Sequence, residues 1–126
     1  MVRPWSSGAT VFLVEDDPDI RSAMQIVLQA DGYEVRTAKN GEDAIQQLHA
    51  GLRPCLILLD LIMPIKDGFE FRAEQLADSA LAGIPVVVYS GHRDVAENAK
   101  RLAAVGYFQK PIDFDTLVEV VGTHCG

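Results

Sequence analysis

Short apolar runs recur along the chain, and several of them end at charged residues. The run at residues 56–60 ends in Asp60, and the run at 10–14 is followed by Glu15 and Asp16. Continuous apolar runs of this length are typical of strands that are buried on both faces of a parallel sheet. We therefore predict a buried strand at each place, with carboxylates where the strand ends.

Stretches with helical spacing separate the predicted strands. After the first strand, Asp17 is a good N-cap and Pro18 suits the first helical position. Ile20, Met24 and Val27 then recur on one face, as in an amphipathic helix that ends near Gly32. The same patterns predict further strands at 33–38, 84–89 and 105–109, and helices around 44–48, at 69–77, at 93–104 and after Asp113.

Five strands thus alternate with five helices. This alternation, with short connections, predicts an α/β fold in which a five-stranded parallel sheet carries helices on both faces. We expect one domain at 9–122, preceded by a flexible lead-in at 1–8, where Trp5 could rest on the domain, and followed by a short tail at 123–126.

The composition narrows the class of protein. The 126 residues carry a net charge of −7, which argues against a surface that binds nucleic acid. No apolar run approaches the length of a membrane span, and residues 1–8 have no secretory signal. Cys55 and Cys125 are too few for a disulfide framework, so we expect reduced thiols in a cytoplasmic protein.

Polar side chains stand at the ends of four predicted strands, namely Glu15 with Asp16, Asp60, Ser90 and Lys110. The carboxyl ends of parallel strands share one edge of the sheet, where ligands bind, so these side chains should converge. Two carboxylates about 5 Å apart repel each other by roughly 3 kcal/mol at an effective dielectric constant near 20. Three carboxylates beside one ammonium therefore favour a divalent cation, and oxygen ligands at an open site favour Mg²⁺.

Such a site has a chemical use. A carboxylate beside Mg²⁺ can attack a phosphoryl group and form an aspartyl phosphate. The cation and Lys110 would share the charge of the phosphoryl oxygens, and Ser90 could donate a hydrogen bond to one of them.

Four motifs resemble the receiver domain of two-component response regulators, over residues 9–121. They are FLVEDD at 12–17, LDLIMP at 59–64 with Asp67 and Gly68, VYSG at 88–91 and GYFQKP at 106–111. The resemblance implies a flavodoxin-like receiver fold with strand order 2-1-3-4-5. It also implies Mg²⁺ or Mn²⁺ as the cofactor.

The resemblance further implies a role for each site residue. Asp60 would accept the phosphoryl group, Lys110 would contact it, and Ser90 and Tyr107 would form the switch. Glu15 stands where the family often has Asp. The metal ligands would be Glu15, Asp16, Asp60 and the backbone carbonyl of Ile62.

On this reading the protein is a signalling switch that catalyses only its own phosphorylation and slow dephosphorylation. Its partners would be a sensor histidine kinase or a histidine phosphotransfer protein, and a downstream protein target, with no direct contact to nucleic acid or membrane. Ile62, two residues after Asp60, cannot orient a water, so we expect slow loss of phosphate. The downstream target would bind the face of the fourth helix, fifth strand and fifth helix, with candidates Val95, Asn98, Ala99, Gln109 and Phe114.

Other classes compete with this reading. A degenerate receiver would bind proteins without taking phosphate, although the full set of site residues argues against it. A phosphatase with a nucleophilic Asp would want a second carboxylate where Ile62 stands. A nucleotide-binding enzyme is disfavoured, because no Gly-rich loop followed by Lys and Ser or Thr is present.

Overall fold

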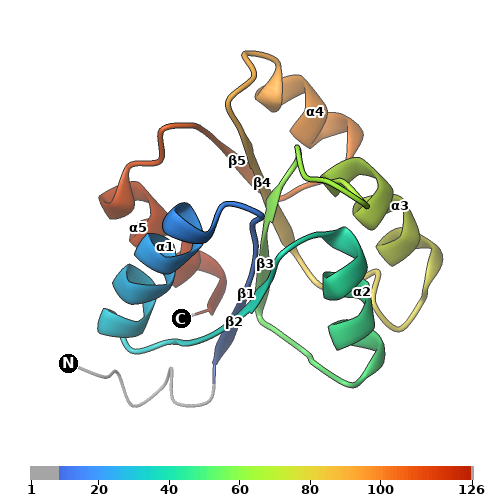
Figure 1. Ribbon diagram of the computed structural model, residues 1–126, viewed down its shortest axis with the longest axis horizontal. Coiled ribbons are helices and arrows are strands. Elements are labelled where there is room, and N and C mark those ends of the chain that lie inside the picture. Colours follow the sequence, from blue (N-terminus) through green and yellow to red (C-terminus); the bar gives the residue numbers. More distant parts are fainter. Residues whose placement is uncertain (1–8, 126) are drawn as a thin grey trace.

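A computed structural model describes residues 9–125, which form a sheet between two layers of helices (Figure 1). All neighbouring strands are parallel, in the order β2-β1-β3-β4-β5, so the predicted fold class and strand order are confirmed. The elements alternate along the chain as β1 (Thr10–Val14), α1 (Pro18–Ala30), β2 (Glu34–Ala38), α2 (Gly41–His49), β3 (Leu56–Asp60), α3 (Gly68–Ala77), β4 (Val86–Ser90), α4 (Val95–Arg101), β5 (Gly106–Gln109) and α5 (Phe114–Cys125).

Each face of the sheet packs against its own helices. Helices α1 and α5 cover one face, and α2, α3 and α4 cover the other (Figure 1). Along β1, Phe12 and Val14 belong to the core under α2, whereas Val11 and Leu13 belong to the core under α1. Successive side chains of a strand point to opposite faces, so a strand covered on both sides must be apolar throughout.

Side-chain caps determine where three helices begin. The Asp17 carboxylate accepts hydrogen bonds from two backbone N–H groups of the first turn of α1, as predicted. Asn40 caps α2, and Asp67 forms a capping box with Glu70 at the start of α3. Gly32 follows α1 with a φ of 98°, a left-handed conformation that suits glycine.

Helix α4 is shorter than the predicted helix at 93–104. It covers only Val95–Arg101. Asp94 precedes it without a side-chain cap hydrogen bond, and Ala103 turns the chain out of the helix with a φ of 54°. The alanine-rich sequence continues past these points, so composition alone overestimates the length of the helix.

The buried side chain of Arg72, on α3, binds the end of α4. Its guanidinium donates hydrogen bonds to the carbonyls of Leu102 at 2.8 Å and Ala103 at 3.0 Å, and to Gln75 Oε1 at 2.7 Å. A cation is favourable at the carboxyl end of a helix, where backbone carbonyls lack partners. The last turn of α4 is therefore attached to α3.

The two cysteines form a disulfide, so the prediction of reduced thiols is wrong. Cys55 lies directly before β3 and Cys125 ends α5, and their Cα atoms are 5.5 Å apart. Helix α5 runs back along the sheet after β5, so its last turn reaches the edge where β3 begins. Two cysteines gave no disulfide pattern in the sequence, so the cysteine count alone did not indicate this pairing.

The predicted lead-in at 1–8, with Trp5, lies outside the described residues. Helix α5 continues to Cys125, so residues 123–125 are helical.

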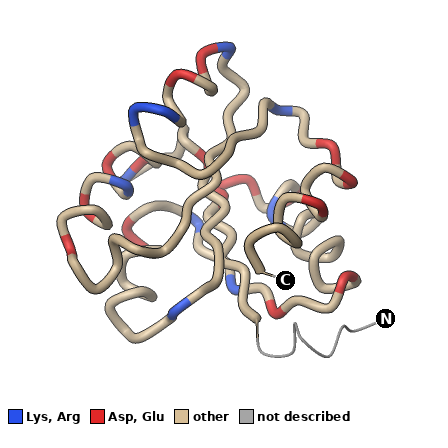
Figure 2. Tube along the Cα trace, turned by 180° about the vertical axis from the view of Figure 1, so that it is seen from behind, with Lys and Arg blue, Asp and Glu red and all other residues tan. Residues whose placement is uncertain are grey.

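Among the described residues, no helix is long and apolar enough to cross a membrane. Acidic positions are spread over helices and loops and mixed with Lys and Arg (Figure 2).

Candidate functional site

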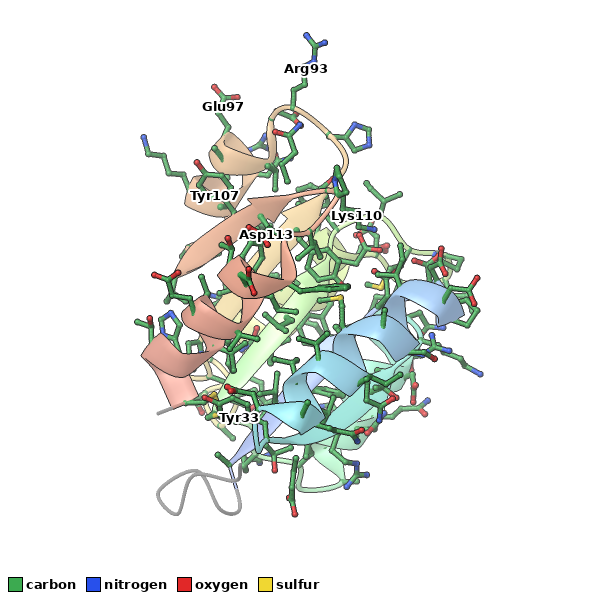
Figure 3. The ribbon with its side chains drawn as sticks, turned by 90° about the vertical axis from the view of Figure 1, so that its left-hand side faces the viewer. Tyr33, Arg93, Glu97, Tyr107, Lys110 and Asp113 are labelled. Atoms are coloured by element: carbon green, nitrogen blue, oxygen red, sulfur yellow. A yellow bond between two sulfur atoms is a disulfide. The ribbon has the colours of Figure 1, made fainter. Side chains whose placement is uncertain are left out.

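Four strands bring their polar ends together at one edge of the sheet. Carboxylate oxygens of Glu15, Asp16 and Asp60 lie within 4.8 Å of one another. Lys110 lies at this edge, while Tyr33 lies near the opposite one (Figure 3). The convergence predicted from the strand topology is therefore present, and we call these three carboxylates the acidic cluster.

Asp60 ends the central strand β3 and is only 2% exposed. Its Oδ1 accepts a hydrogen bond from the Ile62 backbone N–H at 3.2 Å, and its Oδ2 accepts one from Lys110 Nζ at 3.3 Å. Burial, and then the charge of Glu15, raise the pKa of Asp60 to about 7, against the opposing effect of Lys110. Additional positive charge would therefore favour the ionised form of Asp60 at neutral pH.

Lys110 reaches the acidic cluster from the end of β5. Its backbone N–H donates to the Ser90 carbonyl at 2.9 Å, and its peptide bond to Pro111 is cis. Its Nζ lies 3.3 Å from Asp60 Oδ2 and 3.6 Å from Glu15 Oε1. One ammonium cannot balance three carboxylates, so the edge keeps an excess of negative charge.

Glu15 is fully buried and is held by two hydrogen bonds. The Tyr89 hydroxyl donates to Oε1 at 3.0 Å, and the Asp17 backbone N–H donates to Oε2 at 2.9 Å. Burial, followed by the charge of Glu15, raises the pKa of Tyr89 well above its ordinary value, so the hydroxyl keeps its proton. Tyr89 lies in the VYSG motif at 88–91, but no role in the site was predicted for it from the sequence. The sequence feature that could have identified it is its position in a fully buried strand, because a buried tyrosine hydroxyl needs a hydrogen-bond acceptor.

The acidic cluster fits a hard divalent cation. Each of its carboxylates can offer one oxygen, and Asp16 is exposed, so the cluster opens to solvent. Mg²⁺ prefers oxygen ligands and usually keeps several waters, which this opening would admit. Of the predicted metal ligands, these three lie together. The fourth was the backbone carbonyl of Ile62, a residue that lies two positions beyond Asp60 and is 54% exposed.

The loop after β3 is held close to the strand by a glycine. The Gly68 N–H donates to the Leu61 carbonyl at 3.1 Å. A Cβ at position 68 would lie 2.6 Å from the Asp60 carbonyl oxygen, which is too close for any larger residue. Gly68 thus lets α3 start directly against the end of β3, and this fixes the loop that carries Ile62.

The two predicted switch residues lie in different environments. Ser90 is buried, and its Oγ accepts a hydrogen bond from the His92 N–H at 3.2 Å. Among the described residues its hydroxyl donates no hydrogen bond, so its proton is available for another acceptor. Tyr107, on β5, is 52% exposed.

Three of the five residues predicted on the partner face are buried, so that part of the prediction is wrong. Val95, Asn98 and Ala99 lie at helical spacing on the side of α4 that packs onto the protein. Gln109 and Phe114 are exposed, as expected. The solvent-facing residues of α4 are Ala96, Glu97, Lys100 and Arg101.

Comparison with known proteins gives a consistent picture. The sequence model of the response regulator receiver domain matches residues 11–122. The chain is 32% identical over 114 residues to the transcriptional regulatory protein PdtaR of Mycobacterium tuberculosis. This alignment covers 88% of this chain and 54% of PdtaR. It is 31% identical over 112 residues to sporulation initiation phosphotransferase F of Bacillus subtilis, with 88% and 89% covered. The chain thus spans about half the length of PdtaR but most of the second relative.

A solved structure extends this likeness to three dimensions. The response regulator TrrA of Thermotoga maritima, in complex with Mg(2+)-BeF, matches with a TM-score of 0.80 and 30% identity, over 91% of this chain and 97% of TrrA. The residues matched by the family model, 11–122, contain the whole acidic cluster and all of the sheet except Thr10 at the start of β1. Fold, site and sequence therefore agree, and the chain belongs to the family of response regulator receiver domains.

Proposed function

We propose that this receiver domain is a phosphorylation-driven switch, in which Asp60 accepts a phosphoryl group from a sensor histidine kinase or a histidine phosphotransfer protein. The observation that supports it best is a buried carboxylate at the end of β3 with Glu15, Asp16 and Lys110 all beside it. The Mg(2+)-BeF complex of the related TrrA also supports a site for a divalent cation here. We expect the protein to act in the cytoplasm, with its kinase.

The chemistry follows from the charges at the edge. Mg²⁺ or Mn²⁺, held by the acidic cluster and the Ile62 carbonyl, would supply positive charge beside the reacting oxygens. A carboxylate oxygen of Asp60 attacks the phosphorus of the donor; the new O–P bond forms as the donor's bond to phosphorus breaks, and the donor keeps the electron pair. Lys110 then pairs with a phosphoryl oxygen, and the Ser90 hydroxyl donates to another.

The signal would travel from Ser90 to the surface. As Ser90 moves toward the phosphoryl group, Tyr107 turns from its exposed position into the space that Ser90 leaves. This would bias the packing of α4, β5 and α5 between two states. A downstream protein would then bind this face through Gln109, Phe114 and the solvent-facing side of α4.

Phosphorylation by a small phosphodonor tests the proposal directly. Wild-type protein incubated with acetyl phosphate and Mg²⁺ should gain the mass of one phosphoryl group, and should gain none when the divalent cation is chelated. The Asp60→Ala variant should gain none, whereas Asp115→Ala, which alters an exposed carboxylate on α5, should behave as wild type.

Two outcomes would contradict the proposal. Incorporation into Asp60→Ala at the wild-type level would remove Asp60 from the role of acceptor. Failure of the wild-type protein to take phosphate, from acetyl phosphate or from a phosphorylated histidine kinase, would favour the degenerate receiver, which binds proteins without being phosphorylated.

A further inference from the structure

The side chain of Tyr89 contacts three groups at or beside the acidic cluster. It is fully buried on β4, opposite Asp60 in the strand register. Its hydroxyl lies 3.0 Å from Glu15 Oε1 and 3.4 Å from the Val14 carbonyl oxygen, at the end of β1. Its ring centroid is 5.3 Å from Lys110 Nζ, within the range of a cation–π contact. One side chain therefore contacts both an anion and a cation of the site.

The Glu15 carboxylate requires hydrogen bonds that fix its orientation if it is to bind a metal ion. A Glu side chain has one more rotatable bond than Asp, so more conformations must be excluded to place its carboxylate. Here Tyr89 binds Oε1 and the Asp17 N–H binds Oε2. An ionised carboxylate has about four lone-pair positions. The two hydrogen bonds thus orient the group and leave positions that can face a cation.

We propose that Tyr89 is a positioning residue of the metal site: its hydroxyl holds Glu15 in the orientation in which Glu15 shares a divalent cation with Asp16 and Asp60. This inference rests on the proposed function, because it needs the cation. Loss of a side chain that orients a metal ligand typically weakens metal binding by about 10- to 100-fold. A tyrosine that only filled the core would affect stability and leave the affinity for metal unchanged.

Calorimetric titration with MgCl₂ separates these two roles. The Tyr89→Phe variant loses only the hydroxyl, and its affinity for Mg²⁺ should fall about tenfold. Tyr33→Phe is the matched control, since Tyr33 is also a buried tyrosine but lies near the opposite edge of the sheet (Figure 3). Its affinity for Mg²⁺ should equal that of wild type, and thermal unfolding of both variants would report any general loss of structure.

A double-mutant cycle shows whether Tyr89 acts through Glu15. In the Glu15→Asp background the carboxylate is one methylene shorter and is drawn back from the hydroxyl. Adding Tyr89→Phe to Glu15→Asp should therefore change the affinity less than about twofold, because the interaction is already lost. In phosphorylation assays, saturating Mg²⁺ should restore the wild-type rate to Tyr89→Phe, with only the half-saturating Mg²⁺ concentration shifted.

Three results would overturn the inference. The first is wild-type affinity for Mg²⁺ in Tyr89→Phe, and the second is an equal loss of affinity in the wild-type and Glu15→Asp backgrounds. In both cases normal phosphorylation of the wild-type protein would leave the proposed function standing. The third is a wild-type protein that binds no Mg²⁺, which would overturn the metal site and Tyr89's role together.

Discussion

Replacing Asp60 by Asn should stabilise the protein, and the gain should grow as the pH rises from about 4 to about 7. Asn has nearly the same shape as Asp but carries no charge. The folded protein raises the pKa of Asp60 from its ordinary 3.8 to about 7, mainly through burial and then through the charge of Glu15. Folding thus disfavours the ionised form of this side chain, and the variant removes that cost.

The size of the effect follows from the pKa shift. Each pKa unit corresponds to about 1.36 kcal/mol, so a shift of about three units gives about 4 kcal/mol. Between about pH 4 and pH 7 the folded protein keeps a proton that the unfolded chain has released, so wild-type stability falls as pH rises through this window. Counter-ions entering beside the exposed Asp16 would reduce the cost. We therefore expect a gain of about 1 kcal/mol near pH 4.5 and about 2–4 kcal/mol near pH 8.

Urea unfolding of both proteins, in a metal chelator, measures this difference. Comparing variant with wild type at each pH cancels the titration of groups that lie far from Asp60. Adding Mg²⁺ near pH 8 should then stabilise the wild type more than Asp60→Asn, because the cation binds the ionised carboxylate. A gain that is equal near pH 4.5 and pH 8, or a variant that is less stable near pH 8, would refute the reasoning.

Three further changes test other parts of the structure. Cys125→Ser opens a disulfide that spans 70 residues, so urea unfolding should show a loss of about 2–4 kcal/mol, and wild type treated with a thiol reductant should match it. Gly68→Ala places a methyl group against the Asp60 carbonyl and should cost about 1–3 kcal/mol, whereas Gly83→Ala, which meets nothing within 4 Å, should not. Ile62→Asn should release phosphate several-fold faster with stability unchanged, as followed by intact mass over time; an unchanged lifetime would contradict the role given to Ile62.

The parallel sheet was predictable from the hydrophobic pattern and from the alternation of strands and helices, whereas the strand order came from the resemblance to receiver domains. Strands β1 and β3 are apolar without interruption, and each is followed by the residues that stop it. Helix α4 was harder to predict, since its limits depend on a missing cap at Asp94 and on the backbone turn at Ala103. Neither feature changes the hydrophobic pattern. For the same reason, the direction in which α4 faces was misjudged, and Val95 was placed on the surface instead of in the core.

The site was predictable as far as it depends on strand ends. Asp60 and Lys110 meet because parallel strands end at one edge, and this rule needs only the alternation of elements. Contacts that depend on the path of a single side chain were not accessible in this way. Tyr89 reaches from β4 to Glu15, directly after β1, and the pairing of Cys55 depends on where α5 ends, so both required the structure.

The hydrogen bonds from Arg72 to the carbonyls of Leu102 and Ala103, the two residues that follow α4, constrain how this helix can move. The end nearest Ser90 has no side-chain cap, while the far end is fastened to α3 by a buried guanidinium. A movement of Ser90 on phosphorylation would then rotate α4 about its last turn. It would not shift the helix along the sheet. The backbone displacement would be greatest at Asp94 and smallest at Arg101. A partner protein would therefore distinguish the two states best by binding the first turn of α4.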